Sequence, residues 1–169
     1  KFVYELGNAF QQHVDAASRW GSDTLRSQRQ FYETYVEKFV RDGKKAVVII
    51  SDALRYEIAE ELGSRMRQED RFDADLDAVL GVLPSHTQLG MAALLPHTAL
   101  RYSPDGKIVL ADDRPTNGTL PRSKVLETVG GSAIQSEDFN ALSPDERREL
   151  YRSNQVLYIY HDVIDHTGD

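Results

Sequence analysis

Two aspartates that each follow a run of apolar residues carry the first chemical signal in this sequence. Asp52 follows Ala46–Ile50 and one serine, and Asp162 follows Val156–Tyr160 and one histidine. Apolar, β-branched runs of this length predict strands buried on both faces of a parallel sheet. If the two strands are parallel, both carboxylates reach the same edge of the sheet and could hold a cation there. The alternative is structural, because an aspartate after a strand often caps the next helix.

A histidine lies four residues after the second aspartate. Residues four apart share one face of a helical turn, so Asp162 and His166 could bind one ion together. A carboxylate with an imidazole suits zinc or manganese, although this spacing alone also arises by chance. Asp165 is a competing ligand or could orient the imidazole, and we expect His161 to be a structural or ligand-orienting residue.

A hydroxyl-bearing turn supplies the third part of the candidate site. Residues 83–87 read Leu-Pro-Ser-His-Thr, and a short helix of small and apolar residues is expected over 88–95. The free N–H groups and the dipole at a helix start favour phosphate. A hydroxyl held there on a divalent metal would lose its proton easily and could attack phosphorus. Ser85 and Thr87 are the candidates, and the alternative is that either one only caps the helix.

Two further side chains near these motifs are candidates for contact with a substrate. Arg55 lies three residues after Asp52 and could neutralise a phosphate oxygen. It could equally pair with a carboxylate on the surface. His86, between the two hydroxyl residues, could touch the substrate or lie exposed in the loop.

The elements that must position these residues follow an α/β pattern. Residues 1–43 predict a helical lead-in, with helices over 2–17 and 24–41. After it, strands are expected at 46–50, 72–82, 133–134 and 155–160, helices at 54–66, 88–95, 124–129 and 144–152, and a hairpin at 102–110. Alternating strands and helices indicate a mainly parallel sheet with helices on both faces.

Composition excludes several classes of protein. The 169 residues include no cysteine, which excludes disulfide scaffolds and thiolate zinc sites. Twenty basic residues stand against 27 acidic ones, a net charge of −7, which disfavours a protein that clamps nucleic acid by bulk charge. A nuclease whose acidic residues hold cations stays possible on this composition. No apolar stretch reaches the roughly 20 residues of a membrane span, so we expect a cytoplasmic protein without a membrane partner.

Three stretches together resemble the PglZ domain of the alkaline phosphatase superfamily, in the form found in BREX bacteriophage-resistance systems. They are 51–57 (SDALRYE), 84–96 (PSHTQLGMAALLP) and 160–166 (YHDVIDH). The first two together are fairly specific. The resemblance covers residues 44–169, and it implies an α/β/α sandwich around a mostly parallel sheet, with 44–169 as the N-terminal part of that domain.

The resemblance also implies an activity and a set of site residues. It implies a metal-dependent phosphoesterase with two divalent ions, zinc or else Mn or Mg, and a Ser or Thr nucleophile. Thr87 matches the nucleophile, Asp52 matches a ligand of the metal that activates it, and Asp162 with His166 match the ligands of the other metal. Ser85, Arg55 and His86 would then lie near the substrate. Phosphodiesterase or nuclease chemistry implies nucleic acid or a nucleotide as substrate, with other BREX proteins as partners.

The sequence departs from the superfamily pattern at its end. The superfamily normally supplies a further Asp-His pair and a late His, whereas only Thr167–Asp169 follow His166. We therefore expect a segment of a larger protein, incomplete at the C-terminus and inactive by itself. One rival is a catalytically inactive scaffold of the same fold that binds other defence proteins. Another is a receiver-like or nucleotide-binding module, which leaves the Pro-Ser-His-Thr turn unexplained.

Overall fold

The structure is a computed structural model that describes the backbone of residues 1–168 and the side chains of residues 1–165. Its helices are α1 (Phe2–Ala16), η1 (Gln28–Gln30), η2 (Tyr32–Val36), α2 (Glu37–Arg41), α3 (Tyr56–Arg67), α4 (Thr87–Ala93), α5 (Thr119–Leu126), η3 (Glu127–Val129), α6 (Ser136–Ala141), α7 (Pro144–Ser153) and α8 (Val163–Gly168). Its strands are β1 (Arg26–Ser27), β2 (Ala46–Ser51), β3 (Val79–Leu80), β4 (Leu100–Tyr102), β5 (Val109–Ala111), β6 (Arg114–Pro115), β7 (Gly131–Gln135) and β8 (Val156–His161).

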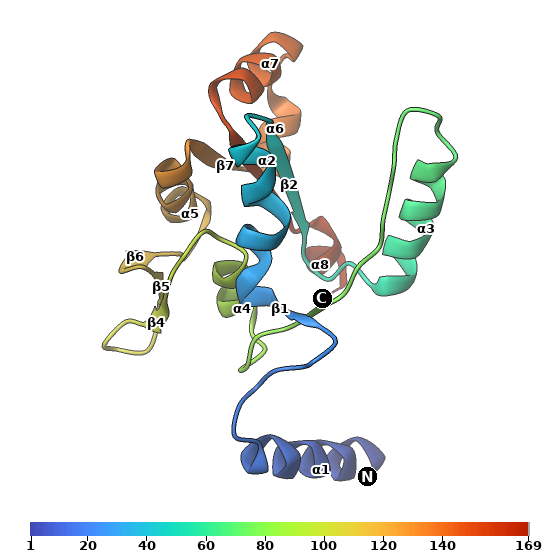
Figure 1. The fold of residues 1–169 in the computed structure, drawn as a ribbon, viewed down its shortest axis with the longest axis vertical. Coiled ribbons are helices and arrows are strands. Elements are labelled where there is room, and N and C mark those ends of the chain that lie inside the picture. The colour runs from blue at the N-terminus through green and yellow to red at the C-terminus, as the bar shows by residue number, and fades with distance from the viewer. Residues whose placement is uncertain (169) are drawn as a thin grey trace.

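The central sheet has three parallel strands in the order β2–β8–β7 (Figure 1). The register pairs Ala46 with Val156 at one end of β2 and Ser51 with His161 at the other. The middle strand β8 is buried from Val156 to Tyr160, as expected for a strand with neighbours on both sides. The prediction of an α/β fold with a mainly parallel sheet is therefore confirmed.

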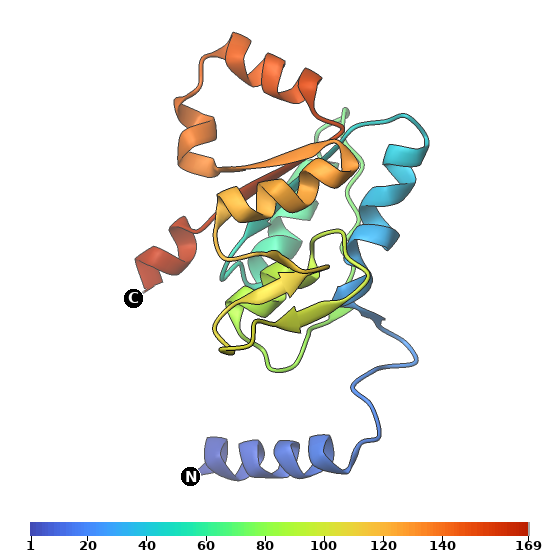
Figure 2. The ribbon, with the colours of Figure 1, turned by 90° about the vertical axis from the view of Figure 1, so that its left-hand side faces the viewer.

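The main core lies on one face of this sheet. Tyr158 and Tyr160 of β8 are buried there against residues of η2, α5 and the end of α4, including Val36, Leu126 and Leu95. The Tyr158 hydroxyl donates a hydrogen bond of 2.6 Å to the Leu94 carbonyl. This bond joins α4 to the middle of the sheet and so fixes the helix that begins at Thr87. Figure 2 shows these helices stacked beside the strands.

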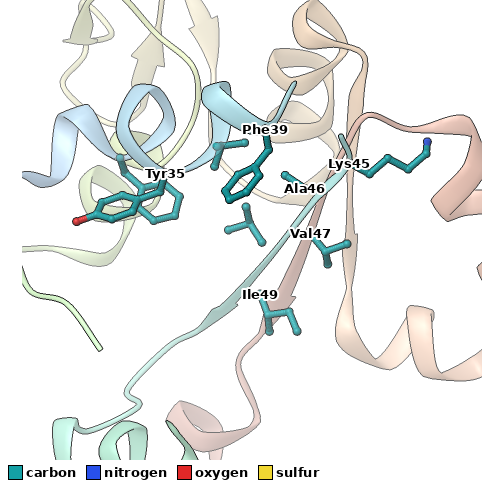
Figure 3. A pocket seen from close by; sticks show the side chains of 9 residues that line it. Tyr35, Phe39, Lys45, Ala46, Val47 and Ile49 are labelled. Carbon is teal, nitrogen blue, oxygen red and sulfur yellow. The ribbon is translucent and has the colours of Figure 1, made fainter. Parts of the chain in front are cut away.

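The opposite face of the edge strand β2 is open. Val47 is 45% exposed and Ile49 is 68% exposed, although the sequence predicts that β2 is buried on both faces. That prediction is wrong for this face, because the described elements that cover β2 pack on its other face, where Ala46, Val48 and Ile50 contact the core. A hollow of about 450 Å³ is lined by β2 and by residues of the η2–α2 segment, among them Tyr35 and Phe39 (Figure 3).

The N-terminal lead-in is helical at its start and irregular afterwards. α1 matches the predicted helix closely, but it stands away from the rest of the chain with its apolar side chains exposed (Figures 1 and 2). The predicted helix over 24–41 is instead a short strand, a 3₁₀ turn, a π-helical turn and α2. The Trp20 indole donates to the Gly81 carbonyl at 2.6 Å, which ties the linker after α1 to the remainder of the chain.

Some of the other local predictions are confirmed and others are wrong. The helix start at Ser143 is confirmed as a capping box with Glu146, and the hairpin of β4 and β5 is also confirmed. The strand expected over 72–82 is wrong except for β3, which pairs with β1. α5 begins at Thr119 and not at residue 124, where the sequence predicts a helix to start, and α6 was not predicted. No helix in the described residues is long and apolar enough to cross a membrane.

One glycine of the sheet allows two strands to approach closely. A Cβ atom on Gly131 would lie 2.5 Å from the Val156 carbonyl oxygen, which is backbone and cannot rotate away. We expect Gly131→Ala to lower the free energy of unfolding by about 1–3 kcal/mol, because β7 must move away from β8. Denaturant unfolding followed by circular dichroism measures this. Gly7→Ala in α1, where no atom lies within 4 Å, is the control and should cause no loss. An unchanged midpoint for Gly131→Ala would contradict the prediction.

A carboxylate holds the start of the β4–β5 sheet. Asp112 accepts hydrogen bonds from the backbone N–H groups of Thr98 and Ala99 at 2.8–3.0 Å, and these bonds hold its pKa below the ordinary value of 3.8. A lowered pKa in the folded state stabilises the fold above pH 3.8, and this contribution is lost as the pH falls below it. We expect Asp112→Asn to flatten the decline of the melting temperature as the pH falls below 3.8. Parallel declines for both proteins would show that Asp112 contributes nothing.

Candidate functional site

The two candidate aspartates leave the sheet at the same edge. β2 and β8 are parallel, and their last residues, Ser51 and His161, are partners in register. The Asp52 N–H donates to the His161 carbonyl at 2.9 Å, so the pairing continues to the point where Asp52 begins. The sequence prediction that Asp52 and Asp162 emerge together is confirmed by this geometry.

A cleft of about 270 Å³ opens at this edge, and we call it the edge cleft. It brings together Asp52, Thr87 and Asp162, three residues that the sequence singles out from distant segments. Asp165 of α8 also lines it, beside Asp162. The remaining lining residues come from β2, α4, α5, β7 and β8: Ile50, Met91, Arg122, Gln135, Tyr160 and His161.

Asp52 does not cap the helix that follows it. The N-cap residue of α3 is Arg55, and it makes no side-chain hydrogen bond to the helix. The Asp52 carboxylate instead accepts a bond of 3.0 Å from the N–H of Ala53, which has a φ of 59° in the left-handed region. A residue other than glycine rarely adopts this conformation, and it bends the chain directly after Asp52. The capping alternative for Asp52 is therefore wrong, and its half-buried carboxylate is available in the edge cleft.

Thr87 is the first residue of α4, and it does not cap that helix either. The cap is His86, whose Nδ1 accepts from the Leu89 N–H at 3.4 Å. Its Nε2 lies 2.6 Å from the Tyr102 hydroxyl, so the ring is held between α4 and β4. The alternative that Ser85 or Thr87 only caps the helix is thus wrong. Within the described residues, no hydrogen bond engages the exposed Thr87 hydroxyl.

Several predicted site residues lie outside the edge cleft. Ser85, His86 and Arg55 are exposed and do not line it. Arg55 is therefore not in a position to contact a substrate bound in this cleft. His166 lies in α8, but its side chain falls outside the described residues, so its predicted pairing with Asp162 stays a prediction.

The cation that the cleft does contain was missed by the sequence analysis. Arg122 of α5 is the sole lysine or arginine among the described residues that line the cleft. Its Nε donates to the Thr116 carbonyl at 2.8 Å, and its Cζ lies 4.7 Å from the centre of the Tyr160 ring. These two contacts hold the guanidinium in place. The arginine was missed because the segment before residue 124 carries no helical periodicity that would assign it a face.

Tyr160 forms part of the same wall and stays a neutral phenol. Burial raises the pKa of its hydroxyl to about 12, and the Arg122 charge only partly opposes this effect. The hydroxyl is buried and, although Arg122 lies beside it, makes no hydrogen bond of ordinary geometry. A phenol of this kind can donate a hydrogen bond but is not an anionic nucleophile at neutral pH, which leaves Thr87 as the hydroxyl nucleophile candidate of the cleft.

The side chains that line the edge cleft offer the types of ligand atom that divalent cations bind. Asp52, Asp162 and Asp165 offer carboxylate oxygens, which suit magnesium and manganese and are also found on zinc. The His161 ring is oriented by the Ser51 hydroxyl, 2.9 Å from Nδ1. The geometry is less complete, since no three His, Cys, Asp or Glu among the described side chains are close enough to enclose a metal.

The comparisons with known proteins agree on one family. The family described as "BREX system PglZ alkaline phosphatase-like domain" matches residues 31–169. The chain is 44% identical over 174 residues to alkaline phosphatase-like protein BrxZ of Escherichia coli O9:H4 (strain HS), covering 99% of this chain and 20% of that protein. It is 38% identical over 152 residues to alkaline phosphatase-like protein PglZ of Bacillus cereus (strain H3081.97), covering 89% of this chain and 18% of that protein.

The chain thus spans about a fifth of the length of the curated relatives that it matches. No solved structure is significantly similar to it. The family match begins at residue 31, within the segment that the sequence analysis treats as a lead-in. The match over residues 31–169 includes every element that lines the edge cleft. The chain therefore belongs to the PglZ family, the alkaline phosphatase-like domain of BREX systems.

Proposed function

We propose that this chain carries part of the active site of a metal-dependent phosphoester hydrolase. The observation that supports this most directly is the edge cleft, where the Thr87 hydroxyl and the carboxylates of Asp52 and Asp162 meet from three separate elements. Such a set serves phosphoryl transfer through a hydroxyl nucleophile. Membership of a family described as alkaline phosphatase-like agrees with this reaction class.

The residues of the cleft divide into three roles. Asp52, Asp162 and Asp165 would hold divalent cations, zinc or, given their oxygen donors, manganese or magnesium. A bound cation of this kind lowers the pKa of a coordinated hydroxyl and offsets negative charge on phosphorus-bound oxygens. Thr87 would lose its hydroxyl proton to solvent, and its Oγ1 would form a bond to phosphorus while the bond to the ester oxygen breaks. That oxygen would take up a proton from water and leave as the alcohol, and a second water would later cleave the phosphothreonine and restore Thr87. His166 would add an imidazole ligand, as the sequence predicts.

Charge explains why cations are needed before an anionic substrate can bind. Three carboxylates line the cleft, and Arg122 is the sole lysine or arginine among the described lining residues. An anionic phosphoester would therefore meet a net negative wall unless cations occupy the carboxylates. Once they do, the Arg122 guanidinium can donate to phosphoryl oxygens, a geometry that arginine favours. Arg122 takes the place that the sequence analysis gives to Arg55.

The substrate and partners of the whole protein follow from its family as proposals. We infer a phosphoester of a nucleotide or nucleic acid as substrate and other proteins of a BREX system as partners. The decisive experiment measures hydrolysis of bis-nitrophenyl phosphate by the full-length protein, with metal content determined in the same preparation. Turnover that is lost with a chelator and restored by zinc or manganese supports the hydrolase.

An inactive scaffold of the same fold is the second candidate. It is favoured by one observation, the lack of a three-residue metal group among the described side chains. A scaffold should purify without stoichiometric metal, and chelators should leave its binding to other defence proteins unchanged. Absence of both metal and turnover in the full-length protein would overturn the hydrolase and leave this candidate.

A further inference from the structure

Two polar residues face each other at the carboxyl ends of neighbouring strands. Gln135 is the last residue of β7, and Tyr160 is its partner in register on β8. Partners in register point to the same face of a sheet, so these two side chains are neighbours. Both line the edge cleft together with Thr87 and Asp52.

Both residues carry a buried polar atom that lacks a hydrogen bond of ordinary geometry. The Gln135 side-chain oxygen has no such partner in the described chain, and the Tyr160 hydroxyl has only the Arg122 guanidinium beside it, outside ordinary hydrogen-bond geometry, while Tyr160 is only 3% exposed. An unpaired buried polar group lowers stability, and most buried polar groups in proteins are paired. Packing alone would be served as well by leucine and phenylalanine, which lack these atoms. The two groups therefore suit a ligand that supplies the missing partner.

The chemistry of the pair selects the ligand group. An amide offers one acceptor and one donor atom, and a phenol hydroxyl both donates and accepts. A ligand hydroxyl is complementary to this pair whichever way the amide is turned, because it also donates and accepts. Beside them, the Arg122 Nε already donates to the Thr116 carbonyl, so the two terminal nitrogens of the guanidinium are the donors left for a phosphoryl group.

We propose that Gln135 and Tyr160 form a specificity subsite that recognises a hydroxyl group close to the phosphorus of a sugar or polyol phosphoester. Arg122, fixed on the Tyr160 ring, binds the phosphoryl oxygens of the same molecule. The inference rests on the proposed function to the extent that a phosphoester occupies the edge cleft. It predicts a preference for esters with a neighbouring hydroxyl over plain alkyl or aryl esters.

The test compares two ligands that differ only in hydroxyl groups, glycerol 3-phosphate and propyl phosphate. Calorimetry in zinc-containing buffer measures both affinities for the full-length protein carrying Thr87→Ala, so that neither ligand is consumed. We expect glycerol 3-phosphate to bind about tenfold more tightly, the effect of one or two hydrogen bonds. Tyr160→Phe and Gln135→Leu should each reduce this ratio to about twofold or less, with the affinity for propyl phosphate unchanged.

A matched control is available on the same strand. Ser132 of β7 also carries a buried hydroxyl without a partner, but it does not line the edge cleft. Ser132→Ala should keep the tenfold ratio, whereas equal loss in this variant would overturn the subsite in favour of a general packing effect. Tyr160→Phe removes no hydrogen bond of ordinary geometry, so the melting temperature of this variant should match that of the wild type. A loss of the preference for glycerol 3-phosphate in this variant would therefore not be caused by unfolding.

The outcomes separate this inference from the proposed function. Equal affinities for the two ligands, or no binding of either, overturn the subsite even if the protein hydrolyses nitrophenyl esters. A tenfold ratio that depends on Tyr160 and Gln135 supports the subsite even if the protein shows no turnover. In that second case the hydrolase proposal fails while the binding proposal stands.

Discussion

Replacement of Thr87 by alanine in the full-length protein will abolish hydrolysis of bis-nitrophenyl phosphate while the fold survives. Loss of a covalent nucleophile lowers turnover by about 10⁴-fold or more in enzymes whose residues act as a unit. The fold should persist because the Thr87 side chain is exposed and caps nothing; the cap of α4 is His86. Steady-state turnover, together with an unchanged circular dichroism melt, measures both parts.

Two controls sharpen this result. Thr87→Ser keeps a hydroxyl at the same position and should retain part of the turnover. Ser85→Ala alters an exposed hydroxyl that does not line the edge cleft and should leave turnover unchanged. Full turnover by Thr87→Ala would remove Thr87 from the mechanism, and loss of turnover in Ser85→Ala instead would move the nucleophile to Ser85.

The second large effect is expected for Asp52→Asn. The amide keeps the shape of the side chain but removes the charge that would bind a cation, so metal affinity should fall by at least about 100-fold. Turnover should fall with it. In metal-free protein the substitution should not lower stability, because it relieves repulsion among the three carboxylates of the edge cleft. Metal content by elemental analysis and chelator titration give the measurement.

The matched control for this variant is Asp23→Asn. Asp23 is an exposed aspartate whose only described partner is Arg19, at 3.5 Å on the surface. It should leave metal content and turnover as in the wild type. If Asp52→Asn binds metal as tightly as the wild type, the cation is held elsewhere and the role proposed for Asp52 is wrong.

The sequence by itself determined the strands and the helix that carry the candidate site residues. The apolar runs before Asp52 and Asp162 predict β2 and β8, and the turn before Thr87 predicts α4, all of which the structure contains. These elements are predictable because strand and helix periodicity are local properties of the chain. The capping box at Ser143 is local for the same reason.

Only the tertiary structure decided which side chains share the edge cleft. Arg122 and Gln135 reach it because α5 packs across β7 and because β7 lies beside β8, contacts between segments that no local pattern connects. Arg55 is excluded from it because the left-handed turn at Ala53 directs the chain away after Asp52. The openness of β2 was equally hidden, since burial depends on which neighbours a strand finds and not on its own residues.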